Sequence, residues 1–270
     1  MGSFCGLVNK WLNFICTVRR QPNGGVKPRL GFLAGELRYL AMLNFEIDPE
    51  ALFPHVPPGT EIDMWRGKTF ISVVGFLFLH ARILGVPIFS HRCFEQVSLR
   101  FYVRRETEGG VRRGVAFIKQ IVSKQATASI ARLLYSKHFV TLPMTHKVDF
   151  SDLAERASGN IEYTWYHHGK WHGIHVEVKD DAGFPLPDSE EEFTIERYWG
   201  YSSQANGSCL EYRVEHPRWR VWLGSASAFT CDDATAYGPD LGACLIRTPS
   251  SALVAEGSPV TVCRVNPLVA

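Results

Sequence analysis

Residues 95–103 read EQVSLRFYV, and polar and apolar side chains alternate along this stretch. Because successive side chains of a strand point to opposite faces, the alternation predicts a strand with one apolar face. The other face carries amide, hydroxyl, guanidinium and phenol groups, which belong to Gln96, Ser98, Arg100 and Tyr102. The stretch VAFIKQIV at residues 115–122 predicts a second strand, and this strand places Lys119 among apolar neighbours.

Outward from these two strands, the pattern predicts more strands than helices. Further strands are expected over residues 62–65, 69–79, 160–166, 173–178, 193–201, 209–214, 218–223 and 260–265, with an additional element over 37–47. The apolar run 71–79 predicts burial on both faces. Asp48 as N-cap before Pro49 predicts a short helix, and the apolar spacing of residues 126–139 predicts another. The expected fold class is therefore α+β with a dominant antiparallel sheet.

Residues 1–29 are expected to form a separate segment, an amphipathic helix followed by a linker that contains Pro and Gly. The helix is too short and too polar to span a bilayer, and no signal-peptide pattern is present. In one interpretation the helix packs on the domain or on a neighbouring subunit, and in the other it contacts a membrane surface. Residues 30–270 can bury a large core and are expected to form one domain.

The composition excludes several classes of function. The formal net charge is +2 and basic residues are scattered, so the electrostatic footprint of a nucleic-acid-binding protein is missing. The seven cysteines are widely spaced without a CxxC pair, which is typical of reduced thiols in a cytoplasmic protein.

Histidines 167, 168, 172 and 175 surround a predicted hairpin. An exposed hairpin is the commoner interpretation of this pattern, and a metal site is the alternative. We expect no metal and no cofactor.

Several short motifs resemble those of the YqjF-like bacterial domain of unknown function. They are LNF at 43–45 with DP at 48–49, VPPGT at 56–60, DMWRG at 63–67, VGF at 74–76, LRFYV at 99–103, RGV at 113–115, YWGY at 198–201, YRVEHPRW at 212–219 and AEGS at 255–258. This resemblance implies the acetoacetate-decarboxylase-like fold, a mainly antiparallel β-cone or barrel that encloses a small-molecule cavity and has a few peripheral helices. Relatives of that fold assemble into oligomers, so the resemblance also implies that a homo-oligomer can form.

In acetoacetate decarboxylase a lysine forms a Schiff base with a β-keto acid. The stretch FIKQ at 117–120 resembles its Phe-Pro-Lys-Lys stretch, which implies Lys119 as the nucleophile and places Gln120 where the second lysine stands. Gln96 and Gln120 also stand where the family pattern has glutamates, and an amide cannot exchange a proton at neutral pH. Arg100 can supply the missing positive charge. Alternatively, Lys119 is a rim lysine and Arg100 forms a salt bridge, for example with Glu95 or Glu196.

These observations predict a cytoplasmic enzyme that acts on a carbonyl-containing small molecule by lyase, aldolase or cyclase/isomerase chemistry. The predicted catalytic residues are Lys119, Glu196, Arg100 and Tyr102, and the predicted substrate-binding residues are Gln96, Ser98, Gln120, Tyr198, Trp199 and His216. Glu196 is expected to share one strand face with Tyr198 and to act as acid or base, or else to form an ion pair. A binding protein that kept the cavity but lost both glutamates is the second hypothesis, and an assembly protein with a filled cone is the third.

Overall fold

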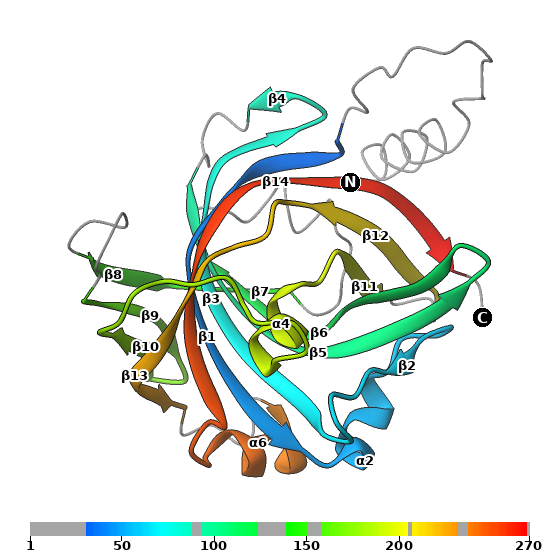
Figure 1. Cartoon of the computed structure of the whole chain (residues 1–270). Coiled ribbons are helices and arrows are strands. Elements are labelled where there is room, and N and C mark those ends of the chain that lie inside the picture. The colour runs from blue at the N-terminus through cyan, green and yellow to red at the C-terminus, as the bar shows by residue number, and fades with distance from the viewer. Residues whose placement is uncertain are drawn as a thin grey trace.

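The computed structural model describes residues 31–87, 93–123, 139–150, 158–204, 207–231 and 237–268 (Figure 1). The elements in chain order are β1 (Leu33–Ile47), α2 (Pro49–Leu52), the 3-10 helix η1 (Phe53–His55), β2 (Glu61–Ile62), β3 (Thr69–Ile83), β4 (Val86–Pro87), β5 (Phe94–Thr107), β6 (Gly110–Ser123), β7 (Phe139–Leu142), β8 (Met144–Phe150), β9 (Gly159–His167), β10 (Lys170–Val178), α4 (Glu190–Ile195), β11 (Trp199–Ser203), β12 (Cys209–Glu215), β13 (Val221–Thr230), α6 (Pro239–Leu245) and β14 (Ser251–Leu268). The predicted α+β class with a mainly antiparallel sheet is confirmed.

The strands close into a barrel. Strands β1, β3, β5, β6, β11, β12 and β14 pair in that order, and β14 pairs back with β1. Among the strands that the structure describes, only the pairs β6–β7 and β6–β11 are parallel. Closure removes the exposed edges that an open sheet of this size would present to other chains.

The two faces of each barrel strand have different neighbours. On β5, Val97, Leu99, Phe101 and Val103 belong to a core on the outer face of the barrel. The even-numbered residues of the same strand, from Gln96 to Tyr102, point into the barrel. The alternation of residues 95–103 therefore separates an outward apolar face from an inward polar face, as the sequence predicts.

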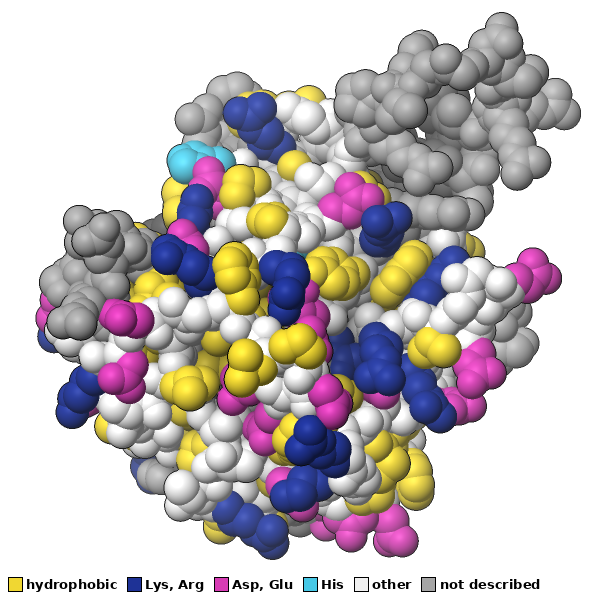
Figure 2. Space-filling view, in the orientation of Figure 1, with side chains coloured by type: hydrophobic (Ala, Val, Ile, Leu, Met, Phe, Trp, Pro, Cys, Tyr) yellow, Lys and Arg dark blue, Asp and Glu magenta, His cyan; other side chains and the backbone are white. Residues whose placement is uncertain are grey.

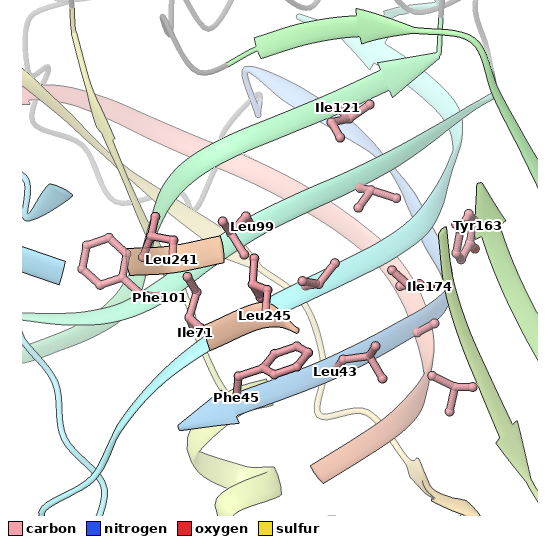
Figure 3. Close-up of a cluster of buried hydrophobic side chains, with 14 of the residues drawn as sticks. Leu43, Phe45, Ile71, Leu99, Phe101, Ile121, Tyr163, Ile174, Leu241 and Leu245 are labelled. Carbon is pink, nitrogen blue, oxygen red and sulfur yellow. The ribbon is translucent and has the colours of Figure 1, made fainter. Parts of the chain in front are cut away.

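A second sheet covers the outer face of the barrel. Strands β13, β10, β9 and β8 form this sheet, which continues from β14. Tyr163 and Ile174 contribute its side of the core, and Leu241 and Leu245 of α6 lie in another part of the same core, beside Phe101, Ile71 and Phe45 (Figure 3). Gly75 permits this close approach, because a Cβ at that position would lie 2.5 Å from the ring of Tyr163.

Helix α4 lies against the inner face of the barrel, where Figure 1 shows it in front of β5 and β6. The ring of Phe193 lies 5.0 Å from the ring of Tyr102, and the backbone of Thr194 accepts a hydrogen bond from Arg100. The predicted strand over residues 193–201 is therefore wrong in its first half. Ser189 caps the helix by accepting a hydrogen bond from the amide of Glu192, and this local cap overrides the β-branched residues that follow.

Most other predicted elements are present. Asp48 caps α2 through the amide of Glu50, and the turn at Arg66 and Gly67 has two positive φ angles, as a tight hairpin turn requires. The run 71–79 is almost wholly buried. The amphipathic helix and linker predicted over residues 1–29 and nearly all of the helix predicted over 126–139 lie outside the described residues.

Candidate functional site

The inner face of the barrel carries a row of polar side chains from two neighbouring strands. Gln96, Ser98, Arg100 and Tyr102 come from β5, and Gln120 comes from β6. Gln96 donates a hydrogen bond from Nε2 to Oε1 of Gln120 over 3.0 Å. Ser98 and Gln120 pair directly across the two strands. The structure thus brings together five of the ten residues that the sequence singles out.

Arg100 is a half-buried cation on this face. Its Nη2 donates to the backbone oxygen of Thr194 over 3.2 Å, and its Nε is buried without a hydrogen bond. Glu95 binds His146, and Glu196 binds Tyr198, so the salt bridges considered for Arg100 do not form. Within the described parts of the chain, no carboxylate pairs with Arg100.

Tyr212 faces the same interior from β12, and sequence reasoning gave it no role in the site. Its ring lies over Gly200 of β11, and the residue is half-buried. Burial raises the pKa of Tyr212, and the positive charge of Arg100 opposes this increase. No hydrogen bond from the Tyr212 hydroxyl to another described residue is present. The only signal in the sequence was the position of this tyrosine in the YRVEHPRW motif.

Tyr102 is fully buried, and its hydroxyl belongs to a hydrogen-bond network. The hydroxyl groups of Tyr102 and Ser72 are 2.5 Å apart, and Ser72 donates to Oδ1 of Asn44 over 2.6 Å. Asn44 donates to Ser251 over 2.9 Å, and Ser251 donates to the carboxylate of Glu190 over 2.5 Å. Burial raises the pKa of Glu190. The network therefore ties α4 to the barrel and occupies the Tyr102 hydroxyl.

Lys119 lies on the other face of β6. It pairs with Leu99, whose side chain belongs to the outer core, whereas Gln120 pairs with Ser98 of the inner face. The ammonium group of Lys119 lies 5.0 Å from the centre of the Tyr237 ring. The structure therefore does not bring Lys119 to Arg100 or Tyr102, as the predicted catalytic set requires.

Glu196, Tyr198 and His216 form a second group at the end of α4. Tyr198 donates a hydrogen bond to Glu196, and the ring of His216 stacks between those of Tyr198 and Trp219. Burial and the Glu196 carboxylate raise the pKa of Tyr198 to about 12. Glu196 is the C-cap of α4 and does not lie in a strand, so the predicted strand face shared with Tyr198 is wrong although the contact exists.

A hollow of about 280 Å³ adjoins this second group. Its lining residues are Trp65, Arg113, Asp188, Ser189, Glu192, Phe193, Glu196 and Arg197. Acidic and basic side chains are interspersed on the face shown in Figure 2, and the hollow is flanked by the ion pairs Arg66–Asp188 and Arg218–Glu192. Most of the charged side chains at this hollow are therefore already neutralised by ion pairs.

Arg197 and Asp63 form a buried ion pair beneath this hollow. Nη1 of Arg197 lies 2.5 Å from Oδ2 of Asp63, and the guanidinium lies 4.0 Å from the centre of the Phe193 ring. Burial lowers the pKa of Arg197, and the charge of Asp63 opposes this. Since breaking a buried ion pair leaves an uncompensated charge, this pair holds the end of α4 in place.

Two other features lie away from the inner face. Trp199 stacks under the guanidinium of Arg112 at 4.2 Å on the outer face, so it does not join the predicted binding residues. A hollow of about 480 Å³ lies between the end of β1, the start of β3 and residues 244–250, and the ion pair of Lys68 with Glu46 lines it. None of the predicted site residues lines this larger hollow.

No group of three His, Cys, Asp or Glu side chains in the described ranges could hold a metal ion. No helix in the same ranges is both long enough and apolar enough to cross a membrane.

Solved structures with the same fold come from acetoacetate-decarboxylase-like enzymes. The enduracididine biosynthesis enzyme MppR complexed with pyruvate aligns with a TM-score of 0.64 and 14% identity, over 93% of this chain and 96% of that chain. Acetoacetate decarboxylase from Legionella pneumophila aligns with a TM-score of 0.59 and 12% identity, over 94% and 93%. An acetoacetate decarboxylase-like enzyme from Sphingomonas wittichii aligns with a TM-score of 0.55 and 14% identity, over 93% and 98%. At these identities the likeness shows the fold alone.

The sequence itself places the chain in a family. No curated protein matches it in sequence. The model of the DUF2071 family, described as "Uncharacterized conserved protein", matches residues 35–259. The chain therefore belongs to this family, the YqjF-like family indicated by its motifs, and has the acetoacetate-decarboxylase-like fold.

Proposed function

We propose that the protein is an enzyme that binds a small carbonyl compound bearing a carboxylate at the inner face of the barrel. The single observation that carries the proposal is Arg100, a half-buried guanidinium without a carboxylate partner among the described residues. A buried charge is costly unless it is paired, so a site that keeps one without a partner is suited to an anionic ligand. Arginine binds a carboxylate through two parallel hydrogen bonds, which also fixes the orientation of the ligand.

The compounds named for the structural neighbours are consistent with a site that carries the positive charge of Arg100. MppR was solved with pyruvate and with the condensation product of pyruvate and imidazole 4-carboxaldehyde, and another neighbour is named for the decarboxylation of acetoacetate. Pyruvate and acetoacetate are both oxo acids. A 2-oxo or 3-oxo acid is therefore the substrate class that we propose, with lyase, aldolase or cyclase/isomerase chemistry at its carbonyl group.

Acid–base chemistry fits the inner face better than Schiff-base chemistry. Lys119 lies on the outer face beside Tyr237, and the other described lysines are exposed. Glu196 stays in the proposal as an acid–base group, because it follows by two residues the Thr194 carbonyl that Arg100 contacts. A carboxylate near a bound carbonyl compound can remove or return the proton at the neighbouring carbon.

Calorimetric titration with pyruvate and with acetoacetate tests the proposal, with product formation followed by proton NMR. Arg100→Met removes the cation and is expected to weaken binding about tenfold to a hundredfold, the worth of hydrogen bonds to a charged group. Arg82→Met is the matched control, because Arg82 lies on β3 with an exposed side chain. Equal affinities of the wild type and Arg100→Met for both acids would overturn the proposal.

A non-catalytic ligand-binding protein is the second candidate. The observation that favours it is the hydrogen bond between the amides of Gln96 and Gln120, at positions where the family pattern has glutamates. Two amides that bind each other supply no exchangeable proton. Arg100-dependent binding without product formation from any oxo acid would support this candidate over the enzyme.

A further inference from the structure

Tyr212 and Arg100 face the same interior from β12 and β5. The strand register connects them, because Tyr212 pairs with Gly200, Gly200 with Val115, and Val115 with Tyr102, which is two residues from Arg100 on the same face of β5. The two strands belong to the same closed barrel, so their inner faces look toward each other across the interior. A ligand held by Arg100 would therefore come within reach of the Tyr212 side chain.

The Tyr212 hydroxyl differs from that of the other inner phenol, because no described residue accepts a hydrogen bond from it. Tyr102 is fully buried and shares its hydroxyl with Ser72. Tyr201, on the outer face, donates to Glu211 over 3.1 Å. Tyr212 is a half-buried residue packed against the inner apolar side chains, and its hydroxyl makes no such bond to the described part of the chain. Buried hydroxyl groups normally have a partner, so this group is suited to one that arrives with a ligand.

The backbone around Tyr212 is built to place its ring. Gly200 pairs with Tyr212 across β11 and β12. A Cβ at Gly200 would lie 2.3 Å from Cε2 of Tyr212 and 2.6 Å from its hydroxyl oxygen, so only glycine leaves room for the ring in this position. The glycine therefore lets the phenol lie close against β11.

We propose that Tyr212 is a ligand-contact residue that donates a hydrogen bond to the carbonyl oxygen of an oxo acid whose carboxylate is held by Arg100. This inference rests on the proposed function and narrows its substrate class. The ligand must carry an oxygen acceptor close to its carboxylate, as 2-oxo and 3-oxo acids do. If negative charge develops on that oxygen during the reaction, the same hydrogen bond becomes stronger and contributes to turnover.

The raised pKa of Tyr212 agrees with a donor role, because the phenol keeps its proton throughout the neutral range. Arg100 provides a second constraint on the ligand. A ligand with an ammonium group at the same position would be repelled by the guanidinium, whereas a neutral carbonyl would not. The pair therefore selects an oxo acid over the corresponding amino acid.

Matched pairs of acids test the proposal by calorimetric titration. Pyruvate and acetoacetate each carry the carbonyl group, and propionate and butyrate are the same acids without it. Tyr212→Phe keeps the ring and removes only the hydroxyl. We expect Tyr212→Phe to weaken the binding of the oxo acids about three- to tenfold, the effect of one neutral hydrogen bond, and to leave propionate and butyrate within about twofold.

Three controls separate the possible results. Arg100→Met is expected to weaken both members of each pair, since both carry the carboxylate. Tyr166→Phe, at an exposed position of β9, is expected to bind all four acids like the wild type. The melting temperature of Tyr212→Phe is expected to match that of the wild type, which excludes a folding defect as the cause of weaker binding.

The possible results distinguish a failure of the role proposed for Tyr212 from a failure of the proposed function. If Arg100→Met weakens binding but Tyr212→Phe leaves the preference for oxo acids unchanged, the role of Tyr212 is wrong and the proposed function stands. An equal loss for oxo acids and their carbonyl-free partners in Tyr212→Phe also overturns the donor role. If none of the four acids binds to the wild type, the proposed function falls, and the role of Tyr212 falls with it.

Discussion

The ring of Tyr212 lies directly over the α-carbon of Gly200 on the neighbouring strand. A Cβ at Gly200 would approach the ring to 2.3 Å, which is far inside ordinary van der Waals contact. Only glycine at this position leaves room for the phenol of Tyr212, so the two residues act as one unit on the inner face of the barrel.

Gly200→Ala tests this unit. The added methyl group must push the Tyr212 ring or separate β11 from β12, so we expect a loss of about 1–3 kcal/mol in the free energy of unfolding. Weaker binding of oxo acids should accompany the loss. Gly183→Ala is the matched control, because a Cβ there meets nothing within 4 Å, and its effect should stay within about 0.5 kcal/mol. Urea unfolding measures both variants, and equal stabilities would contradict the crowding at Gly200.

The ionisation of Tyr212 is the second prediction. Burial and the nearby Cys209 raise its pKa above the ordinary value of about 10, and Arg100 only partly offsets this. Absorbance at 295 nm should therefore show the same phenolate signal in the wild type and in Tyr212→Phe between pH 9.5 and pH 10.5. A smaller signal in Tyr212→Phe would mean that Tyr212 ionises like an exposed tyrosine.

The same shift has a consequence for stability. Because the folded state keeps the proton of Tyr212 more tightly than the unfolded state, its contribution to stability is present below about pH 10 and declines as the pH rises further. The two proteins should be equally stable at neutral pH, and the wild type should lose stability relative to Tyr212→Phe as the pH rises above about 10.

The third prediction concerns the network of Tyr102, Ser72 and Asn44. Ser72 is fully buried, and Ser72→Ala would leave the Tyr102 hydroxyl and the Asn44 oxygen without a partner. We expect a loss of about 1–3 kcal/mol in the free energy of unfolding. Ser225→Ala, at an exposed position, should change it by less than about 0.5 kcal/mol.

A double-mutant cycle tests whether the hydroxyl groups of Tyr102 and Ser72 interact. Tyr102→Phe combined with Ser72→Ala removes both hydroxyl groups, so its cost should be smaller than the sum of the two single costs. Strict additivity would indicate that the two hydroxyl groups do not interact.

The sequence predicted the inner polar row because β5 alternates without interruption. Each residue from Gln96 to Tyr102 keeps its place in a two-residue period, and burial of the outer face by the second sheet fixes which side turns inward. The short helix after Asp48 and the turn at Arg66 and Gly67 were predictable for a similar reason, since their signals are local.

Lys119 does not share the inner face with Arg100 because of one extra residue in β6. Phe117 pairs with Arg100 on the inner face, whereas Lys119 pairs with Leu99 on the outer face, so the register shifts by one residue and places a β-bulge at Ile118. Strict alternation from Phe117 would have turned Lys119 inward. A bulge reverses the face of every residue beyond it, and nothing in the letters FIKQ marks its position.

Helix α4 and Tyr212 were missed for two other reasons. The cap formed by Ser189 and Glu192 is a recognisable helix start, but the β-branched Thr194 and Ile195 favoured a strand. Tyr212 lies far from Arg100 in sequence, and only closure of the barrel turns both toward the same interior. Contacts of this kind follow from topology rather than from local pattern.

The placement of Lys119 leads to the last prediction. Treatment with borohydride in the presence of pyruvate or acetoacetate traps an imine formed by a reactive lysine. Because the Lys119 ammonium lies over the Tyr237 ring on the outer face, we expect no adduct at Lys119 by peptide mapping. Lys119→Ala should keep the affinity of the wild type for both acids. An adduct confined to Lys119 and lost in this variant would show that the bulge does not keep Lys119 outside, and would restore Schiff-base chemistry in place of the acid–base route.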